Sequence, residues 1–238
     1  KNRTVIRSAV SRDLSTWSVE KGKRINFLND IRYQRILSPN VIKISKSLFR
    51  MYFEARTYSN KGFIKSAISK DGLKWKEESG IRIGSNDNYS YGTPFCLYKS
   101  KNNFELFFEL RKKKTRDIWS IKSNDGLNFN KKKSIRTIKQ DYDWEAYSVN
   151  SPNIIYFKKL YHMYYAGHGG EPLRGRILYA YSKDKKNWKK SKIPVLNPGG
   201  IYDHKYCAEP TLIKINKKLK IFYEACDKYN FWRILCAE

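Results

Sequence analysis

Three glutamates recur at one place in a repeated sequence pattern, and two of them are followed by an arginine. Glu54, Glu109 and Glu224 each close an aromatic run, and Arg56 and Arg111 follow the first two at the next position but one. In a strand, residues two apart point to the same face, so each Glu and its Arg would lie side by side. This pattern predicts either of two structures. One is a ring of carboxylates and guanidiniums around a polar substrate, with Arg binding a carboxylate, sulfate or phosphate. The other is a set of Glu–Arg pairs that join neighbouring repeats.

The fourth copy of the pattern carries Gly167 at the glutamate position, and His168 takes the place of the arginine. The run from Gly167 to Gly170 is typical of a flexible loop. We interpret His168 as a substrate contact. A metal ligand is the less favoured reading, because a lone His in a loop is more often incidental.

Four aspartates precede the prolines of the repeat by 9, 7, 9 and 7 residues: Asp30, Asp87, Asp143 and Asp203. Asp143 is followed by Trp144, and Asp203 stands between Tyr202 and His204. Aromatic rings stack on pyranose faces, so these two positions favour sugar binding. The alternative for each Asp is that it caps a loop turn.

Three markers recur in the same order and define a repeat. The Ser-x-Asp turns are Ser11-x-Asp13, Ser69-x-Asp71-Gly72, Ser123-x-Asp125-Gly126 and Ser182-x-Asp184, each followed by Trp or Phe. Pro-headed apolar runs begin at Pro39, Pro94, Pro152 and Pro210, which are spaced by 55, 58 and 58 residues. An aromatic run lies between each proline and the next turn. Repeats of this length indicate propellers, solenoids or arrays.

Each full repeat supplies four strands, and four antiparallel strands form the blade of a β-propeller. Third-strand segments number five, whereas Pro-headed first strands number four. We therefore predict an all-β, five-bladed propeller whose first blade is incomplete in this sequence. A four-bladed ring closed by pairing the two ends is the alternative, but it leaves one third strand surplus. The expected division of the single domain 1–238 is a partial blade at 1–30, blades at about 31–85, 86–140 and 141–198, and a last blade at 199–238.

Composition agrees with a globular β protein, with 40% hydrophobic residues and 18 Tyr. The formal net charge of +27 favours either a polyanionic partner or, as we prefer, solvated loops, because the basic runs lie at or beside inferred turns. The four cysteines lack metal-ligand spacing, so buried small hydrophobic residues are favoured over a disulfide or metal site. We expect no cofactor and no metal.

No apolar run is long enough for a membrane span. No signal peptide is visible, which slightly favours the cytoplasm. The first residue is Lys rather than Met, which leaves room for an upstream segment.

The Pro-headed strands, the Met-Tyr-Tyr-Ala-Gly run and the Ser-x-Asp-Gly-x-x-Trp turns resemble the five-bladed β-propeller glycosidases of families 43, 32, 68, 62, 117 and 130. The turns are similar to the structural Asp-box turns of sugar-processing propellers. In these enzymes an Asp or Glu often stands directly before the inner-strand Pro and points into a central funnel, where two carboxylates act as proton donor and as nucleophile or base. The residues at these positions here are Ser38, Thr93, Ser151 and Glu209, so only Glu209 fits.

The resemblance implies a carbohydrate-active propeller, glycoside hydrolase-like, that acts on or binds a glycan or glycoconjugate. Glu209 is the expected general acid, and Glu54 and Asp143 are further catalytic candidates. Substrate-binding candidates are Arg56, Arg111, Glu109, Glu224, His168, Trp144, Asp203 and Tyr91. A non-catalytic glycan-binding propeller, or one domain of a larger glycan-modifying protein, is the first alternative. A nucleic-acid-binding module is a minor one, because no nucleic-acid motif is present.

Overall fold

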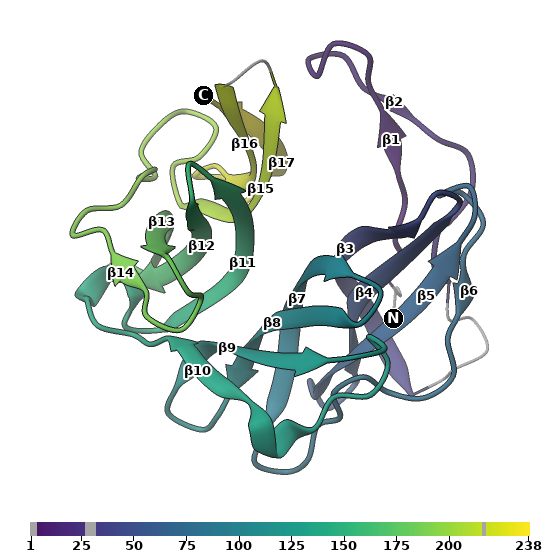
Figure 1. Ribbon diagram of the computed structural model, residues 1–238. Coiled ribbons are helices and arrows are strands. Elements are labelled where there is room, and N and C mark those ends of the chain that lie inside the picture. The colour runs from purple at the N-terminus through teal and green to yellow at the C-terminus, as the bar shows by residue number, and fades with distance from the viewer. Residues whose placement is uncertain (1–3, 27–31, 216–217) are drawn as a thin grey trace.

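The computed structural model describes residues 4–26, 32–215 and 218–238, which form β-sheets arranged around a centre (Figure 1). The predicted Asp30 lies outside the described residues. Each blade is an antiparallel meander in which sequence neighbours pair. The chain thus has the all-β propeller fold that the repeat predicts.

Within the described residues, the first blade is represented by one hairpin, three blades have four strands and the last has three. The first contains β1 (Ala9–Val10) and β2 (Ser18–Val19). The second contains β3 (Tyr33–Ser45), β4 (Leu48–Thr57), β5 (Gly62–Ser69) and β6 (Lys76–Glu77). The third contains β7 (Ser90–Ser100), β8 (Asn103–Arg111), β9 (Arg116–Ser123) and β10 (Ile135–Ile138). The fourth contains β11 (Ser148–Phe157), β12 (Leu160–Gly169), β13 (Arg174–Ser182) and β14 (Lys189–Lys190). The last contains β15 (Tyr206–Ile215), β16 (Lys218–Cys226) and β17 (Trp232–Ala237).

Two 3-10 turns, η1 (Lys131–Lys133) and η2 (Asp143–Glu145), interrupt the connections around β10. A single parallel pair, Gly175 with Tyr206, joins the fourth and last blades into one sheet. We find no helix among the described segments that has the length and apolar character needed to cross a membrane.

The hydrophobic core consists of four clusters, and each fills the space between two successive blades. Ile6 and Ile25 of the first blade pack with Met51 and Phe53 of the second. The other clusters join the second to the third, the third to the fourth and the fourth to the last blade. Aromatic and β-branched side chains dominate these clusters because they cover the pleated surface of a strand efficiently. Cys96, Cys207 and Cys226 are buried, whereas Cys236 is exposed, and all four are free thiols.

The four Ser-x-Asp turns share one hydrogen-bond pattern. In the second blade the Ser69 hydroxyl donates to Asp71 Oδ1 at 3.0 Å, and the same carboxylate oxygen accepts the backbone N–H groups of Leu73 and Lys74, both at 2.8 Å. These N–H groups hold the pKa of Asp71 at about 2. The Trp75 indole donates back to the Gly72 carbonyl at 2.8 Å. The carboxylate is therefore committed to closing the turn.

The position occupied by Gly72 has positive φ in all four turns, including the two where it is not glycine. The φ angles are 75° at Gly72 and 70° at Gly126, but also 63° at Leu14 and 65° at Lys185. Left-handed backbone is strained for residues with a Cβ atom. The geometry of the turn is thus kept even where the sequence opposes it.

Candidate functional site

The residue before the proline lies in a strained bulge in all four inner strands. The φ angles are 48° at Ser38, 43° at Thr93, 49° at Ser151 and 49° at Glu209. Strand pairing is interrupted at each of these positions, for example between Leu37 and Asn40. A bulge inserts an extra residue, bends the strand and redirects a side chain. Such strain on residues with a Cβ atom is typical of functional sites.

The bulges of neighbouring blades touch one another. The Ser151 backbone N–H donates to the Thr93 hydroxyl at 3.0 Å, and the Thr93 N–H donates to Glu54 Oε2 at 3.3 Å. The Ser151 hydroxyl donates to the Asn150 side-chain oxygen at 3.0 Å. All four pre-proline residues also line one cavity, which places them together near the centre of the ring. We refer to Ser38, Thr93, Ser151 and Glu209 as the axis residues.

A cavity of about 1420 Å³ is lined by the four axis residues and by Glu224. It extends outward to Trp17 of the first blade and to Ile234 of β17. The cavity volume is large enough for an oligosaccharide segment. Glu209 and Glu224 therefore border, near the axis, a space that a sugar could enter, and Asp13 and Glu238 line it as well.

Glu209 is the only carboxylate among the axis residues. Burial, followed by the negative charges of Glu224, Glu54 and Glu109, raises the pKa of Glu209 to about 7, although Arg111 acts in the opposite direction. The Glu209 side chain is exposed to the cavity, so water there offsets part of the burial. A ligand that filled the cavity would remove this water and favour the protonated form.

Strand register confirms that three of the recurring glutamates are equivalent and corrects the fourth position. Glu54, Glu109 and Glu224 each pair with the residue that precedes an axis residue. In the fourth blade the corresponding residue is Ala166, which pairs with Asn150, so the assignment of Gly167 was wrong by one position. Gly167 follows its proline by the same number of residues as Glu54 and Glu109 follow theirs, so the spacing in the sequence did not reveal the difference. His168 follows Ala166 by two residues and is equivalent to Arg56 and Arg111.

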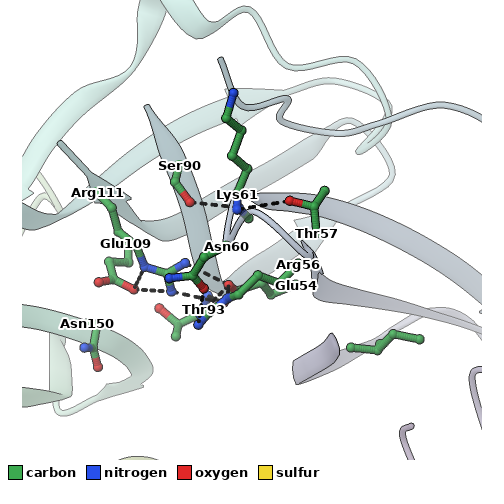
Figure 2. A network of polar contacts seen from close by, with 12 residues as sticks. Glu54, Arg56, Thr57, Asn60, Lys61, Ser90, Thr93, Glu109, Arg111 and Asn150 are labelled. Atoms are coloured by element: carbon green, nitrogen blue, oxygen red, sulfur yellow. Dashed lines mark hydrogen bonds and ion pairs between the residues drawn. The ribbon is translucent and has the colours of Figure 1, made fainter. Parts of the chain in front are cut away.

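Glu54, Arg56, Glu109 and Arg111 form a closed network between the second and third blades (Figure 2). Arg111 donates to Glu54 Oε1 at 2.8 Å and Oε2 at 3.1 Å, and to Glu109 Oε2 at 2.8 Å. Arg56 Nε donates to Glu54 Oε1 at 2.8 Å. Glu54 has no exposed surface, so its carboxylate is enclosed by these partners.

The network stabilises the charged forms of Glu54 and Arg111. Burial opposes ionisation of Glu54, but Arg111 and Arg56 outweigh it and lower the pKa of the carboxyl. Burial also disfavours the charged form of Arg111, yet Glu109 and Glu54 raise the pKa of this guanidinium. Because both oxygens of Glu54 are occupied, this geometry favours the inter-blade pairing that the sequence offered as one of two alternatives.

Glu224 and His168 lie outside this network and are less constrained. Burial raises the pKa of Glu224, and Arg35 acts against it. Burial lowers the pKa of His168 to about 4, and the charge of Arg116 acts in the same direction. His168 is therefore neutral near pH 7. Its Nδ1 lies 3.1 Å from the Ser148 hydroxyl, and its ring lies 6.0 Å from that of Tyr206.

Four of the expected site residues lie away from the axis, namely Asp143, Trp144, Tyr91 and Asp203. Asp143 is exposed in η2, and Trp144 stacks on Tyr142 at 4.8 Å while it packs against the core between the third and fourth blades. Tyr91 is 7% exposed and belongs to the core between the second and third blades.

The Asp203 carboxylate accepts the Gly200 N–H at 2.8 Å and the Tyr223 hydroxyl at 3.1 Å. This matches the turn-capping alternative for Asp203.

The sequence interpretation gave no role to Arg116, although this residue acts on His168. Arg116 opens β9 and is separated by Thr115 from the basic run Lys112 to Lys114, which was interpreted as solvated surface. The missed signal is that Arg116 stands after the turn, at the first residue of the next strand. Among the described residues, no group of three or more His, Cys, Asp and Glu side chains is arranged to hold a metal ion.

Comparisons with known proteins give a fold and a distant relative. No family model matches the chain. The β-1,2-mannobiose phosphorylase of Thermoanaerobacter sp. is 34% identical over 141 residues, a match that covers 56% of this chain and 43% of that protein. The chain thus spans less than half the length of this relative.

Solved structures of similar shape belong to glycoside hydrolases. A thermostable family-43 glycoside hydrolase has a TM-score of 0.80 at 16% identity, with 98% of this chain and 82% of that chain covered. The family 32 β-fructofuranosidase of Bombyx mori has a TM-score of 0.70 at 16% identity over 84% of this chain and 45% of its own. The α-L-arabinanase of Cellvibrio cellulosa has a TM-score of 0.65 at 11% identity over 84% and 72%. The chain has the fold of the five-bladed β-propeller glycoside hydrolases.

Proposed function

We propose that this chain is a carbohydrate-active enzyme of the propeller glycosidase type, in which Glu209 donates a proton to the leaving glycosidic oxygen. The observation that carries the proposal is the position of Glu209 in the strained axis bulge, with its carboxyl on the cavity and its pKa raised. A general acid must hold its proton near neutral pH and release it in the transition state. A carboxyl with an ordinary pKa would have lost that proton.

Hydrolysis also needs a second group that attacks the anomeric carbon or activates water. Glu224 is the candidate that the cavity favours, because it lines the same space and is the largest charged influence on Glu209. Glu54 is less suited because Arg56 and Arg111 occupy its oxygens. Asp143 remains a candidate only if the substrate reaches the exposed turn η2.

Phosphorolysis is a second candidate, and two observations favour it. Glu209 is the only acid among the axis residues, and the curated relative is named a phosphorylase. Phosphate is already a nucleophile and needs no protein base. Its oxygen would attack the anomeric carbon, the glycosidic C–O bond would break, and Glu209 would protonate the leaving oxygen. The products would be a sugar 1-phosphate and a shortened glycan.

A non-catalytic glycan-binding role is the remaining alternative, and Ser38, Thr93 and Ser151 favour it because they cannot serve as acids or bases near neutral pH. The test is a panel of manno-, arabino-, xylo- and fructo-oligosaccharides, incubated with the full chain with and without inorganic phosphate.

The proposal expects product release that Glu209→Gln abolishes. Dependence on phosphate would select phosphorolysis, and product without phosphate would select hydrolysis. If oligosaccharides of the panel bind but none of them is cleaved, the enzymatic proposal is overturned.

A further inference from the structure

The turn between β8 and β9 concentrates positive charge on the third blade. Five of the six residues from Arg111 to Arg116 are basic, and none is acidic. A hydrogen bond from the Lys112 N–H to the Thr115 carbonyl at 2.8 Å closes the turn, which leaves Lys113 and Lys114 exposed at its tip. The turn is therefore an ordered structure that presents several cations to solvent.

Arg111 and Arg116 pair directly across the two strands but differ in their partners. Arg111 is neutralised by Glu54 and Glu109. Arg116, in the part of the chain that the structure describes, makes no side-chain hydrogen bond or ion pair and only lies 4.5 Å from the centre of the Tyr147 ring. Of the two paired arginines, Arg111 is thus neutralised by carboxylates, whereas the charge of Arg116 remains available to an anionic ligand.

Aromatic rings stand beside the unpaired cations. Lys112 Nζ lies 5.0 Å from the Trp119 ring centre and 5.7 Å from that of Tyr89. Tyr147 is 50% exposed and Tyr89 is 38% exposed. The buried Trp119 indole N–H has no hydrogen-bond partner among the described residues. An aromatic ring with a cation beside it can stack on a sugar and bind an anionic substituent of that sugar at the same time.

This basic aromatic surface is linked to the axis through His168. His168 Nδ1 lies 3.5 Å from the Asn150 side-chain nitrogen, and Asn150 accepts the hydroxyl of the axis residue Ser151. The charge of Arg116 adds to the burial that lowers the pKa of His168. The aromatic and basic residues of this surface do not line the cavity itself, so a glycan bound at the axis would reach them only by extending past His168 toward the β8–β9 turn.

We propose that Lys112, Lys113, Lys114 and Arg116, with Tyr89, Trp119 and Tyr147, form a subsite for an anionic sugar, meaning one that carries a carboxylate, sulfate or phosphate group. We call this set the basic rim. The inference rests on the proposed carbohydrate function and names the substrate class. A guanidinium binds each of these anionic groups through paired N–H donors. Because the groups share this chemistry, the experiment must distinguish them.

The test measures binding by calorimetry on the full chain at two salt concentrations. The probes are tetragalacturonate for carboxylate, a sulfated carrageenan tetrasaccharide for sulfate, mannose 6-phosphate for phosphate and mannotetraose as the neutral sugar. We expect one or more anionic probes to bind about tenfold more tightly than mannotetraose. Arg116→Gln should remove this advantage and leave mannotetraose binding unchanged.

A matched pair of double variants controls for charge alone. Lys113→Gln with Lys114→Gln removes two charges from the basic rim, and Lys132→Gln with Lys133→Gln removes two exposed charges from η1. Only the first pair should weaken anionic sugar binding, by about threefold. Arg116→Gln should not lower the melting temperature, because among the described residues the Arg116 side chain makes no hydrogen bond or ion pair that the variant would break.

The outcomes separate this inference from the proposed function. Equal binding of neutral and anionic sugars, unaffected by Arg116→Gln, would overturn the inference and leave the function intact. Selective anion binding without cleavage of any sugar in the panel would overturn the enzymatic function and support the inference. Equally tight binding of a single-stranded oligonucleotide, weakened equally by both double variants, would show general polyanion attraction and overturn the subsite.

Discussion

The Ser-x-Asp turns and the axis bulges both occur four times, but the turns repeat a set of residues whereas the bulges repeat a backbone conformation. The turns keep the same residues and the same hydrogen bonds, with Ser and Asp at fixed positions in every copy. The bulges keep the same backbone, with φ between 43° and 49°, while the residue changes from Ser to Thr to Glu. Constant chemistry indicates a task that every blade shares. Constant geometry with varied chemistry indicates a common centre to which each blade contributes a different group.

The largest expected effect is on the axis. Glu209→Gln removes the proton donor and should lower the rate of glycosidic cleavage by about 10²- to 10⁴-fold. In the wild type the rate should fall as pH rises through about 7, because the active form of Glu209 is protonated. Ser38→Ala, at the equivalent bulge, is the control and should cost far less. An equal loss in both variants, measured as kcat/KM, would contradict the assignment.

Glu209→Gln should lower activity but raise the stability of the fold at alkaline pH. A carboxyl whose pKa is higher in the folded state stabilises the fold at low pH and loses that contribution as pH rises from 4.5 through about 7. The neutral amide avoids this loss. Thermal melts at pH 8 should therefore show the variant melting about 2 °C or more above the wild type, with little difference at pH 4.

Glu54→Gln should have the largest effect on folding. It leaves Arg111 buried with one carboxylate partner fewer and should lower the free energy of unfolding by about 3–5 kcal/mol. The pKa of Glu54 is lowered in the fold, so its contribution is present above pH 4.5 and is lost as pH falls. Urea unfolding at pH 7 and pH 3 measures both effects. Asp87→Asn, which breaks an exposed pair with Lys61, should change little.

The Ser-x-Asp turns should affect stability without affecting chemistry. Asp125→Ala removes the acceptor of two backbone N–H groups and should lower the free energy of unfolding by about 1–2 kcal/mol. This turn also accepts Arg50 and the Tyr52 hydroxyl from the second blade, so its loss should loosen two blades. The folded fraction should keep its kcat. A drop in kcat at constant folded fraction would contradict the division between turn and axis.

The smallest expected effect comes from the strained turn position. Leu14→Gly should raise the free energy of unfolding by about 0.5 kcal/mol, because relief of left-handed strain exceeds the added freedom of the unfolded chain. Gly72→Ala, where space is open but φ is 75°, should lower it by about 1 kcal/mol. Denaturant midpoints of the two variants should move in opposite directions. Movement in the same direction would show that packing rather than φ decides.

The sequence was sufficient for the fold because the repeat states it four times. Turn residues, prolines and aromatic runs each predict one strand boundary, and neighbouring copies confirm each other. The repeat did not reveal that the residue equivalent to Glu54 in the fourth blade is Ala166 and not its neighbour Gly167. Only strand pairing, in which Ala166 lies opposite Asn150, distinguishes the two positions.

The candidate site was less predictable, since charged residues with the same spacing have different partners in space. Arg111 and Arg116 look alike as sequence, but only the three-dimensional arrangement shows that Glu54 and Glu109 enclose the first. Trp144 beside Asp143 suggested a sugar platform, whereas its ring packs into a core cluster. The axis bulges were signalled by the prolines, but their shared left-handed conformation required the backbone itself.

The four inter-blade clusters also set how the molecule opens locally. The second, third and fourth blades are packed on both sides, whereas the described parts of the first and last blades meet through an edge contact between Trp17 and Phe222, 5.7 Å apart. Local opening requires least energy where fewest apolar contacts are lost. Amide protons of β1, β2 and β17 should therefore exchange fastest, and those of β8 and β12 slowest. The strands that are expected to open first therefore lie beside the part of the cavity that Trp17 and Ile234 line.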